Sequence, residues 1–236
     1  MRRKPWARPE LDACAFYVKD PPSLLGHWKS AFARPELPMQ LELGCGKGGF
    51  IAPVAASTPD VNFLAVDIKS EVLALTKRAL DKEFADASRS VDNALIAAFD
   101  IERIHLVLGA DDIFERIYIN FPNPWPKDRH KKKRLTHPRA LAHYRDFLSD
   151  DARLFIKTDD DELYTDTLGY LSESGFEIVT SSFDLYSECA PTLPLTEHEQ
   201  MFISRGLPIH YIEAAKRPLP LLSAPAAPYT PCPTCG

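Results

Sequence analysis

Apolar residues in the middle of the chain occur in short continuous runs, which alternate with longer segments where apolar residues recur every three or four positions. A short apolar run is typical of a strand that is buried on both faces, and the longer spacing is typical of an amphipathic helix. We therefore expect strands at residues 39–43, 61–66, 93–98, 116–121, 152–157, 176–183 and 208–213. Helices are expected at residues 48–56, 69–85, 101–108, 138–148 and 162–172.

This alternation predicts an α/β fold with a doubly wound, mostly parallel seven-stranded sheet. Ligands of such sheets bind at the carboxyl ends of the strands. Prolines are concentrated near both ends of the chain, which indicates that the compact part lies between them. We expect a proline-rich flank over residues 1–38 that is partly packed on the domain, one domain over 39–215, and a disordered tail over 216–236.

Composition indicates how large a hydrophobic core the chain can form and in which compartment the protein is expected. With 236 residues, of which 45% are hydrophobic, the chain has enough apolar material for a substantial core. No apolar run approaches the ~20 residues that cross a bilayer, and no apolar segment follows the charged start MRRKPW. The cysteines are odd in number and mostly scattered, which argues against a disulfide framework. We expect a cytoplasmic protein without a membrane segment.

The stretch from Ile117 to Leu135 joins a strand to a stiff loop and a block of cations. Pro122, Pro124 and Pro126 fix φ and remove three N–H donors, which excludes a helix or an inner strand there. Residues 127–134 hold six Lys or Arg and one Asp, a local charge of +5 in a chain of formal charge -5. We expect a polyanion to bind this block, because phosphate attraction depends on the local patch. The alternative is a charge run that faces solvent.

The segment LELGCGKGG, residues 41–49, has glycines at alternate positions after the first expected strand. Such glycines let the backbone approach a nucleotide-like ligand at the positive end of the next helix. Glu42 would repel a pyrophosphate but suits a cationic or amino-acid-bearing ligand. Asp67, after the next strand, is placed to accept hydrogen bonds from ribose hydroxyls, and Asp100 is placed to meet an adenine amino group. The alternative is a tight turn with acids that cap helices.

Together these motifs resemble known families. E-x-G-x-G-x-G followed by an acid after the next strand is similar to class I S-adenosylmethionine-dependent methyltransferases, which have a Rossmann-like fold. FPNPWPKDRHKKKRL, with Lys157-Thr158-Asp159 and Thr196-Glu197-His198-Glu199, resembles the tRNA (guanine-N7)-methyltransferase family over roughly residues 20–215. The resemblance implies S-adenosylmethionine as cofactor, tRNA as partner, and methylation of guanosine 46 in the variable loop, although no residue here fixes that number.

The resemblance also implies the site residues. Cofactor contacts fall on Glu42, Gly44, Cys45, Gly46, Asp67, Ile68, Asp100, Ile101 and Asn123. Contacts with tRNA fall on Lys127, Arg129, His130, Lys131, Lys132, Lys133, Arg134, Asp159, Thr196, Glu197, His198 and Glu199.

Asn123, the expected catalytic residue, departs from the family pattern, in which FPDPW has an aspartate. Guanine N7 carries an in-plane lone pair and no proton, so it attacks a sulfonium methyl without a general base. Catalysis then depends mainly on alignment, which contributes ~7 to 11 kcal/mol when the geometry is good. Asn123 can still orient the cofactor amine or the guanine edge, so we expect activity with some lost stabilisation of the cationic product.

Three other motifs have two interpretations each. Glu199 and Asp159 are candidates to accept from guanine N1–H and N2–H₂, whereas Thr196-x-x-Glu199 also fits a capping box and Asp159 a charged helix start. Trp125 fits either a stack on an RNA base or a buried anchor of the loop.

The tail motif Cys232-x-x-Cys235 is half of a zinc knuckle. Cys14, Cys45 and Cys189 supply no second half, so we expect no metal there unless another copy of the chain completes the site.

Two rival functions remain open at this point. Asn123-Pro124-Trp125 partly resembles the N-P-P-Y/F/W loop of enzymes that methylate exocyclic amines, although here Pro126 follows Trp125. The chain also fits an inactive RNA-binding protein that has kept the fold. The sequence leaves open whether the protein is a monomer or a homodimer.

Overall fold

The computed structural model describes residues 4–188 and 195–218. The described chain forms one eight-stranded sheet of order β1-β4-β3-β2-β5-β6-β8-β7. β8 is antiparallel to β6 and β7, and the other neighbours are parallel, so the expected α/β fold with a mostly parallel sheet is confirmed. The strands are β1 Tyr17–Val18, β2 Met39–Leu43, β3 Asn62–Asp67, β4 Ala94–Ala98, β5 Phe114–Asn120, β6 Leu148–Thr158, β7 Phe176–Ser182 and β8 His210–Lys216.

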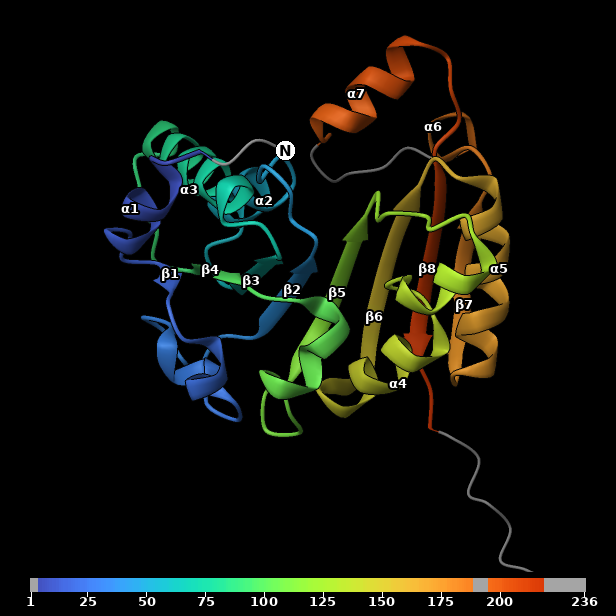
Figure 1. Cartoon of the computed structure of the whole chain (residues 1–236), viewed down its shortest axis with the longest axis horizontal. Helices are drawn as coiled ribbons and strands as arrows, with labels where there is room; N and C mark the ends of the chain where they lie inside the picture. Colours follow the sequence, from blue (N-terminus) through green and yellow to red (C-terminus); the bar gives the residue numbers. More distant parts are fainter. Residues whose placement is uncertain (1–3, 189–194, 219–236) are drawn as a thin grey trace, which may run out of the picture.

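Helices cover the sheet, and one of them stands apart from it. α1, α2 and α3 gather beside the half of the sheet that holds β3 and β4, while α4 and α5 lie beside the other half (Figure 1). α7 stands above the carboxyl ends of β5 and β6 in the same view. The α-helices are α1 Ala7–Asp12, α2 Ile51–Ser57, α3 Ser70–Asp86, α4 Pro138–Asp146, α5 Asp161–Glu173, α6 Leu185–Glu188 and α7 Glu197–Ser204. The 3-10 helices are η1 Pro21–Leu24, η2 Trp28–Ala31, η3 Ile101–Leu106 and η4 Asp128–Lys133.

All seven expected strands are present, and the eighth strand is an addition. β1 has two residues and pairs Tyr17 with Ile96 at the edge of the sheet. A strand this short has no periodicity, so the sequence pattern did not predict it. The short helices α1 and α6 and the 3-10 turn η4 within the cationic block were also not expected, and for α7 the sequence gave only the capping box that begins at Thr196.

The flank before β2 is tied to the domain by buried contacts. Trp28 is 1% exposed, and its indole N–H donates to the carbonyl of Val107 at 2.6 Å. The carboxylate of Asp112 accepts the backbone N–H groups of Gly26 and Trp28 at 2.7 and 3.0 Å. These bonds satisfy buried polar groups of the flank and fix its path across the domain.

β2 lies in the middle of the sheet and carries polar groups into the core. All five of its residues are buried, including Gln40 and Glu42. The phenol of Tyr118 in β5 donates to Gln40 Oε1 at 2.9 Å. Glu42, two positions further on, reaches the carboxyl end of the strand, which is where sheets of this kind bind ligands.

Two expectations fall wholly or mostly outside the described residues. Only residues 216–218 of the expected tail are described, and the cysteines at 189, 232 and 235 lie outside the described ranges. Cys14 and Cys45 are described and are free and buried. Within residues 4–188 and 195–218, no helix is long and apolar enough to cross a membrane.

Candidate functional site

A cleft of about 790 Å³ opens at the carboxyl ends of the central strands. Its walls come from the glycine turn after β2, from the end of β5, and from α3 and α7. Glu42, Gly46, Asn120 and His198 all line it. Residues that are far apart in the sequence therefore meet at the edge of the sheet where a ligand was expected.

The glycine turn is held against α3 at a distance that only glycine allows. Gly48 has φ +84°, and a Cβ placed on it would lie 3.0 Å from Cα and Cγ2 of Thr76. The hydroxyl of Thr76 donates to the carbonyl of Gly46 at 2.7 Å, which fixes the turn from the same side. Any larger residue at position 48 would push the turn away from α3.

Asp67 links the glycine turn to the end of β3. Its Oδ2 accepts from the N–H of Gly46 at 3.2 Å, and its Oδ1 accepts from the N–H of Lys69 at 2.9 Å. Beside it, Ile68 leaves 59% of its surface exposed. Asp100 follows the adjacent strand β4 and caps η3 by accepting from the N–H of Glu102 at 3.1 Å. The predicted cofactor residues Asp67, Ile68 and Asp100 therefore lie at the ends of neighbouring strands. Of the two carboxylates, only Asp100 caps a helix, as the alternative interpretation expects, because α3 has no side-chain cap.

Glu42 is a buried carboxylate with one oxygen unused. Asn120 Nδ2 donates to its Oε1 at 3.1 Å, whereas Oε2 has no hydrogen-bond partner in the described structure. Burial raises the pKa of Glu42 to about 7; the bond from Asn120 opposes this rise, and the charge of Asp67 adds to it. A buried acceptor at a cleft that lacks a partner fits a ligand that brings a cationic N–H group. Burial likewise raises the pKa of the Cys45 thiol.

The proline-rich loop after β5 has a strained backbone that several bonds hold in place. Phe121 and Trp125 have φ of +50° and +44°, a region that costs non-glycine residues roughly 1 to 3 kcal/mol. Phe121 N–H donates to the carbonyl of Lys157 at 2.8 Å, and Arg134 Nε donates to the carbonyl of Pro124 at 2.6 Å. Strain of this size beside a cleft is typical of a functional loop.

Asn123 is exposed and shapes this loop through its own side chain. Its Oδ1 accepts from the backbone N–H of Trp125 at 3.1 Å. An aspartate would make the same bond, so the turn does not depend on which of the two residues stands there. Trp125 is half-buried against His130, and the ammonium of Lys133 lies 5.1 Å from its ring centre. The indole is therefore neither the fully buried anchor nor the fully exposed stacking surface of the two interpretations.

The cationic block divides into two groups. Lys131 and Arg134 turn toward two acids of α5: Lys131 Nζ lies 2.5 Å from Glu162 Oε1, and Arg134 Nη1 lies 2.5 Å from Asp166 Oδ2. The Arg134 side chain is 0% exposed, so the structure gives it no open face for a phosphate. The remaining cations are exposed and have no ion pair within the described residues: Lys127, Arg129, Lys132 and Lys133.

Glu199 is the centre of a buried network at the start of α7. Its Oε1 accepts from Lys157 Nζ and from the Tyr186 hydroxyl, each at 2.5 Å, and its Oε2 accepts from the N–H of Thr196 at 2.8 Å. Thr196 Oγ1 in turn accepts from the N–H of Glu199, so the expected capping box is confirmed. Burial favours a raised pKa for Glu199, but the charge and hydrogen bond of Lys157, together with the bonds from Tyr186 and the Thr196 N–H, lower the pKa below its ordinary value, which favours the ionised carboxylate. Sequence reasoning gave no role to Lys157 or Tyr186, because neither pairing leaves a local pattern.

His198 lines the cleft, and Asp159 lies next to it. His198 packs between Phe121 and Phe202, with ring centroids 4.2 and 4.6 Å away, and its Nε2 lies 3.9 Å from Asp159 Oδ1. Asp159 itself is exposed, and the cap of α5 is the next residue, Asp160, whose Oδ1 accepts from the N–H of Leu163. Asp159 is therefore available to a ligand. Of the motif that runs from position 196, only the side chain of Glu197 lies outside what the structure describes.

Comparisons with known proteins agree with this geometry. A family model described as a putative methyltransferase matches residues 36–212. A tRNA (guanine-N(7)-)-methyltransferase of Clostridium perfringens (strain SM101 / Type A) is 49% identical over 92% of this chain and 99% of its own length. One from Ruminiclostridium cellulolyticum is 48% identical over 91% of each chain.

Similarity to solved structures extends to the fold alone. The crystal structure of the 16S rRNA methyltransferase KamB matches with a TM-score of 0.55 at 13% identity, covering 77% of this chain and 88% of that one. An aminoglycoside resistance methyltransferase matches with a TM-score of 0.51 at 14% identity, covering 80% and 89%.

Proposed function

Because this chain belongs to the tRNA (guanine-N(7)-)-methyltransferase family, we propose that it transfers the methyl group of S-adenosylmethionine to N7 of guanosine in tRNA. We further propose guanosine 46 of the variable loop as the target. The observation that carries the proposal is the meeting of the glycine turn, Glu42 and the carboxyl end of β5 at one cleft, with the cationic proline loop following that strand end, in a chain 49% identical to a curated relative.

The cleft fits this cofactor by its chemistry. When bound, S-adenosylmethionine supplies an electrophilic methyl group on a positively charged sulfur. The unpartnered Oε2 of Glu42 suits the ammonium of the amino-acid part, and Asp67 suits a ribose. We assign the cofactor to Glu42, Gly44, Cys45, Gly46, Asp67, Ile68, Asp100, Ile101 and Asn123.

Methyl transfer to guanine N7 depends on the alignment of the two substrates more than on a general base. Guanine N7 has no proton to remove, so the chain's own residues act by holding the base and excluding other geometries. Asn123 Oδ1 accepts one bond from Trp125 and retains a second lone pair for a ligand N–H. Asp159 is exposed beside His198 and accepts from the Watson–Crick edge of guanine in this proposal. Glu199 is 0% exposed and does not line the cleft, so in this proposal it acts indirectly, by holding the start of α7 and with it His198 beside the base.

The exposed cations of the loop bind phosphates of the tRNA. Lys127, Arg129, Lys132 and Lys133 have no ion pair in the described chain, so a phosphate does not have to displace a protein carboxylate. Lys131 and Arg134 act indirectly, by holding the loop against α5. His130 makes an edge contact with the half-buried ring of Trp125, and this pair offers aromatic surface to an unstacked base in this proposal.

Nucleoside mass spectrometry tests the proposal. Incubation of unmodified tRNA with the protein and S-adenosylmethionine should yield N7-methylguanosine, and a transcript with adenosine in place of guanosine 46 should yield none. A methyl group on N2 of guanine or N6 of adenine would instead support an exocyclic-amine methyltransferase. Absence of S-adenosylmethionine binding by calorimetry would support a pure RNA-binding protein.

A further inference from the structure

A second, smaller crevice lies beside the cationic block and outside the cleft. Its volume is about 60 Å³, and it is enclosed by η3, by the end of η4 and by the start of α4. Lys132 and Lys133 come from η4, whereas Arg139 and His143 come from α4. Neither α4 nor η3 belongs to the motifs that point to tRNA.

The charges around this crevice are mostly positive and largely uncompensated. Lys132, Lys133 and Arg139 are exposed, and none has an ion pair within residues 4–188 and 195–218. Glu102 is the one carboxylate among the lining residues, and it is exposed as well. Three cations around so small a space repel one another, and an anion between them would remove that repulsion.

Neighbouring histidines also indicate a positive potential here. Burial lowers the pKa of His137, and the charges of Arg139, Lys132 and Arg134 lower it further. His143 stacks on His105 of η3 with ring centroids 4.6 Å apart, so the crevice has an aromatic wall whose ring nitrogens can donate to an anion.

The floor of the crevice is the back of the cofactor cleft. Ile101 and Leu135 line the crevice. A Cβ on Gly44 would lie 4.0 Å from Leu135 Cδ1, which places this leucine against the glycine turn. A group held in the crevice therefore sits one side chain away from the turn that faces the cleft.

We propose that this crevice binds a single phosphate of the tRNA backbone, with Lys132 and Arg139 as its main contacts and Lys133 at its rim. The proposal rests on the function proposed above, and extends the RNA-binding surface from the proline loop onto α4. Arg139 offers a planar fork that matches phosphate oxygens, and Lys132 offers a compact charge. A phosphate fixed at this point sets the register of the RNA on the protein but carries no sequence information.

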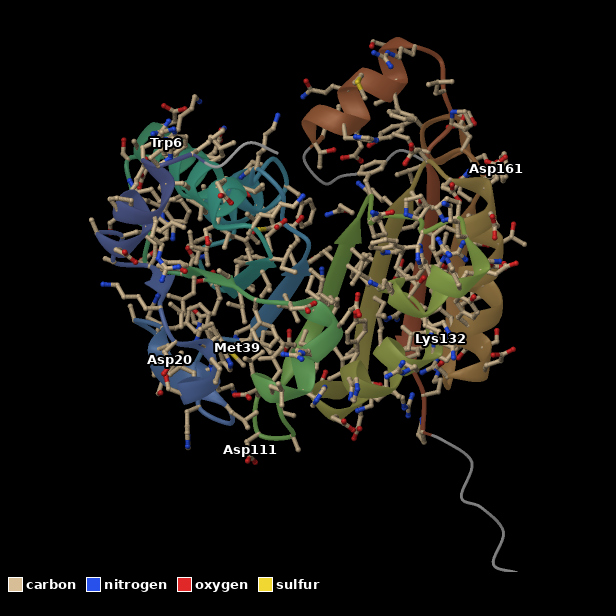
Figure 2. The ribbon with its side chains drawn as sticks, viewed as in Figure 1. Trp6, Asp20, Met39, Asp111, Lys132 and Asp161 are labelled. Atoms are coloured by element: carbon tan, nitrogen blue, oxygen red, sulfur yellow. The ribbon has the colours of Figure 1, made fainter. Side chains whose placement is uncertain are left out.

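Single neutral substitutions test the crevice. Arg139→Gln and Lys132→Gln each remove one cation, and Lys19→Gln removes an exposed cation next to Asp20, which lies well away from Lys132 in Figure 2. Binding of tRNA is measured by fluorescence anisotropy over a range of salt concentrations. Both crevice variants should bind tRNA several-fold more weakly, with the slope of log affinity against log salt smaller by roughly 0.7 to 0.9, the value for one phosphate. Lys19→Gln should behave as the unsubstituted protein.

Two further readouts separate the possible results. The affinity for S-adenosylmethionine, measured by calorimetry, should be the same in all variants, because none of these side chains faces the cleft. Lys132 already belongs to the proposed phosphate contacts of the loop, so Arg139→Gln is the deciding variant: an unchanged salt slope in it, or an equal loss in Lys19→Gln, would overturn the crevice proposal. If the unsubstituted protein binds tRNA but forms no N7-methylguanosine, the proposed function fails, while the slopes still decide whether the crevice holds a phosphate.

Discussion

The ammonium of Lys157 lies 2.5 Å from the carboxylate of Glu199, and the two side chains are 4% and 0% exposed. Lys157 is near the end of β6, next to Asn120 of β5 in the sheet, whereas Glu199 is in the first turn of α7. This ion pair joins the sheet to a helix whose later residues, from Met201 to Ser204, are mostly exposed. The placement of α7 over the cleft therefore depends on a few buried polar bonds at its N-terminus.

Lys157→Met should destabilise the protein or release α7. The substitution leaves the Glu199 charge buried without its partner, which typically costs about 3 to 5 kcal/mol. Urea unfolding measures the loss, and hydrogen exchange shows whether it is confined to α7. The double variant Lys157→Met/Glu199→Gln should recover much of the stability, because no unpaired charge remains.

A surface ion pair on the same strand provides the control. Arg153 and Glu213 lie 3.0 Å apart with side chains 38% and 23% exposed. Arg153→Met should cost about 1 kcal/mol or less, because exposed pairs contribute little. Equal losses in Arg153→Met and Lys157→Met would show that burial does not distinguish the two pairs.

Glu42→Gln should make the protein without cofactor more stable at alkaline pH. The pKa of Glu42 in the folded protein is about 7, against an ordinary value of 4.5, so between these values the folded state holds more proton than the unfolded state. The free energy of unfolding therefore falls as pH rises through this window, by at most about 3.5 kcal/mol at about 1.4 kcal/mol per pH unit. Glu42→Gln has no carboxyl group to ionise, so its free energy of unfolding does not fall in this way. The difference in unfolding free energy between the variant and the unsubstituted protein, measured with urea, should therefore be larger at pH 8 than at pH 5.5. A constant difference between the two proteins would contradict a protonated Glu42.

The same substitution should weaken cofactor binding. A hydrogen bond between a carboxylate and a cationic group is worth about 1.5 to 3 kcal/mol, so the dissociation constant for S-adenosylmethionine should rise roughly ten- to a hundredfold. In the unsubstituted protein, affinity should also rise with pH up to about 7, as Glu42 ionises, and this rise should be absent in Glu42→Gln. Calorimetry at several pH values measures both effects.

Asp67→Ala should raise the dissociation constant for S-adenosylmethionine and leave tRNA binding nearly intact. The carboxylate holds the Gly46 and Lys69 N–H groups and is the proposed acceptor for the ribose hydroxyls, so we expect a loss of roughly ten- to a hundredfold. Asp60→Ala, an exposed acid before β3, is the matched control and should change neither affinity. Loss of both affinities to the same extent in Asp67→Ala would mean that Asp67 only maintains the fold.

The sheet was predictable from the sequence because each long strand is a local apolar run. Met39–Leu43 is a strand over the expected residues, since every one of its side chains is buried and the run has sharp ends. β1 was not predictable, because two residues carry no pattern. α7 has no apolar face packed on the core, and the capping box from Thr196 to Glu199 was its one local signal.

The candidate site was predictable only where its residues follow strand ends. Glu42 is the last residue but one of β2 and Asp67 is the last residue of β3, so topology alone brings them to one edge of the sheet. Pairs such as Lys157 with Glu199, or Arg134 with Asp166, join residues 42 and 32 positions apart and depend on tertiary packing. The sequence showed six equivalent cations between Lys127 and Arg134, and only the structure separates those that face α5 from those that face solvent.

This separation of the cations gives the last prediction. Lys132→Ala/Lys133→Ala removes two exposed charges without ion pairs, so the slope of log tRNA affinity against log salt should fall by about 0.7 to 0.9 for each phosphate that the protein no longer neutralises, with an unchanged melting temperature. Lys131→Ala removes a cation held by Glu162 and Asp166, so it should lower the melting temperature and change the slope much less. Binding titrations over a range of salt concentrations, together with thermal unfolding of the same samples, measure both quantities. If Lys131→Ala flattened the slope as much as the double variant while leaving the melting temperature unchanged, Lys131 would bind phosphate directly, and the bonds to α5 would not be what holds this loop in place.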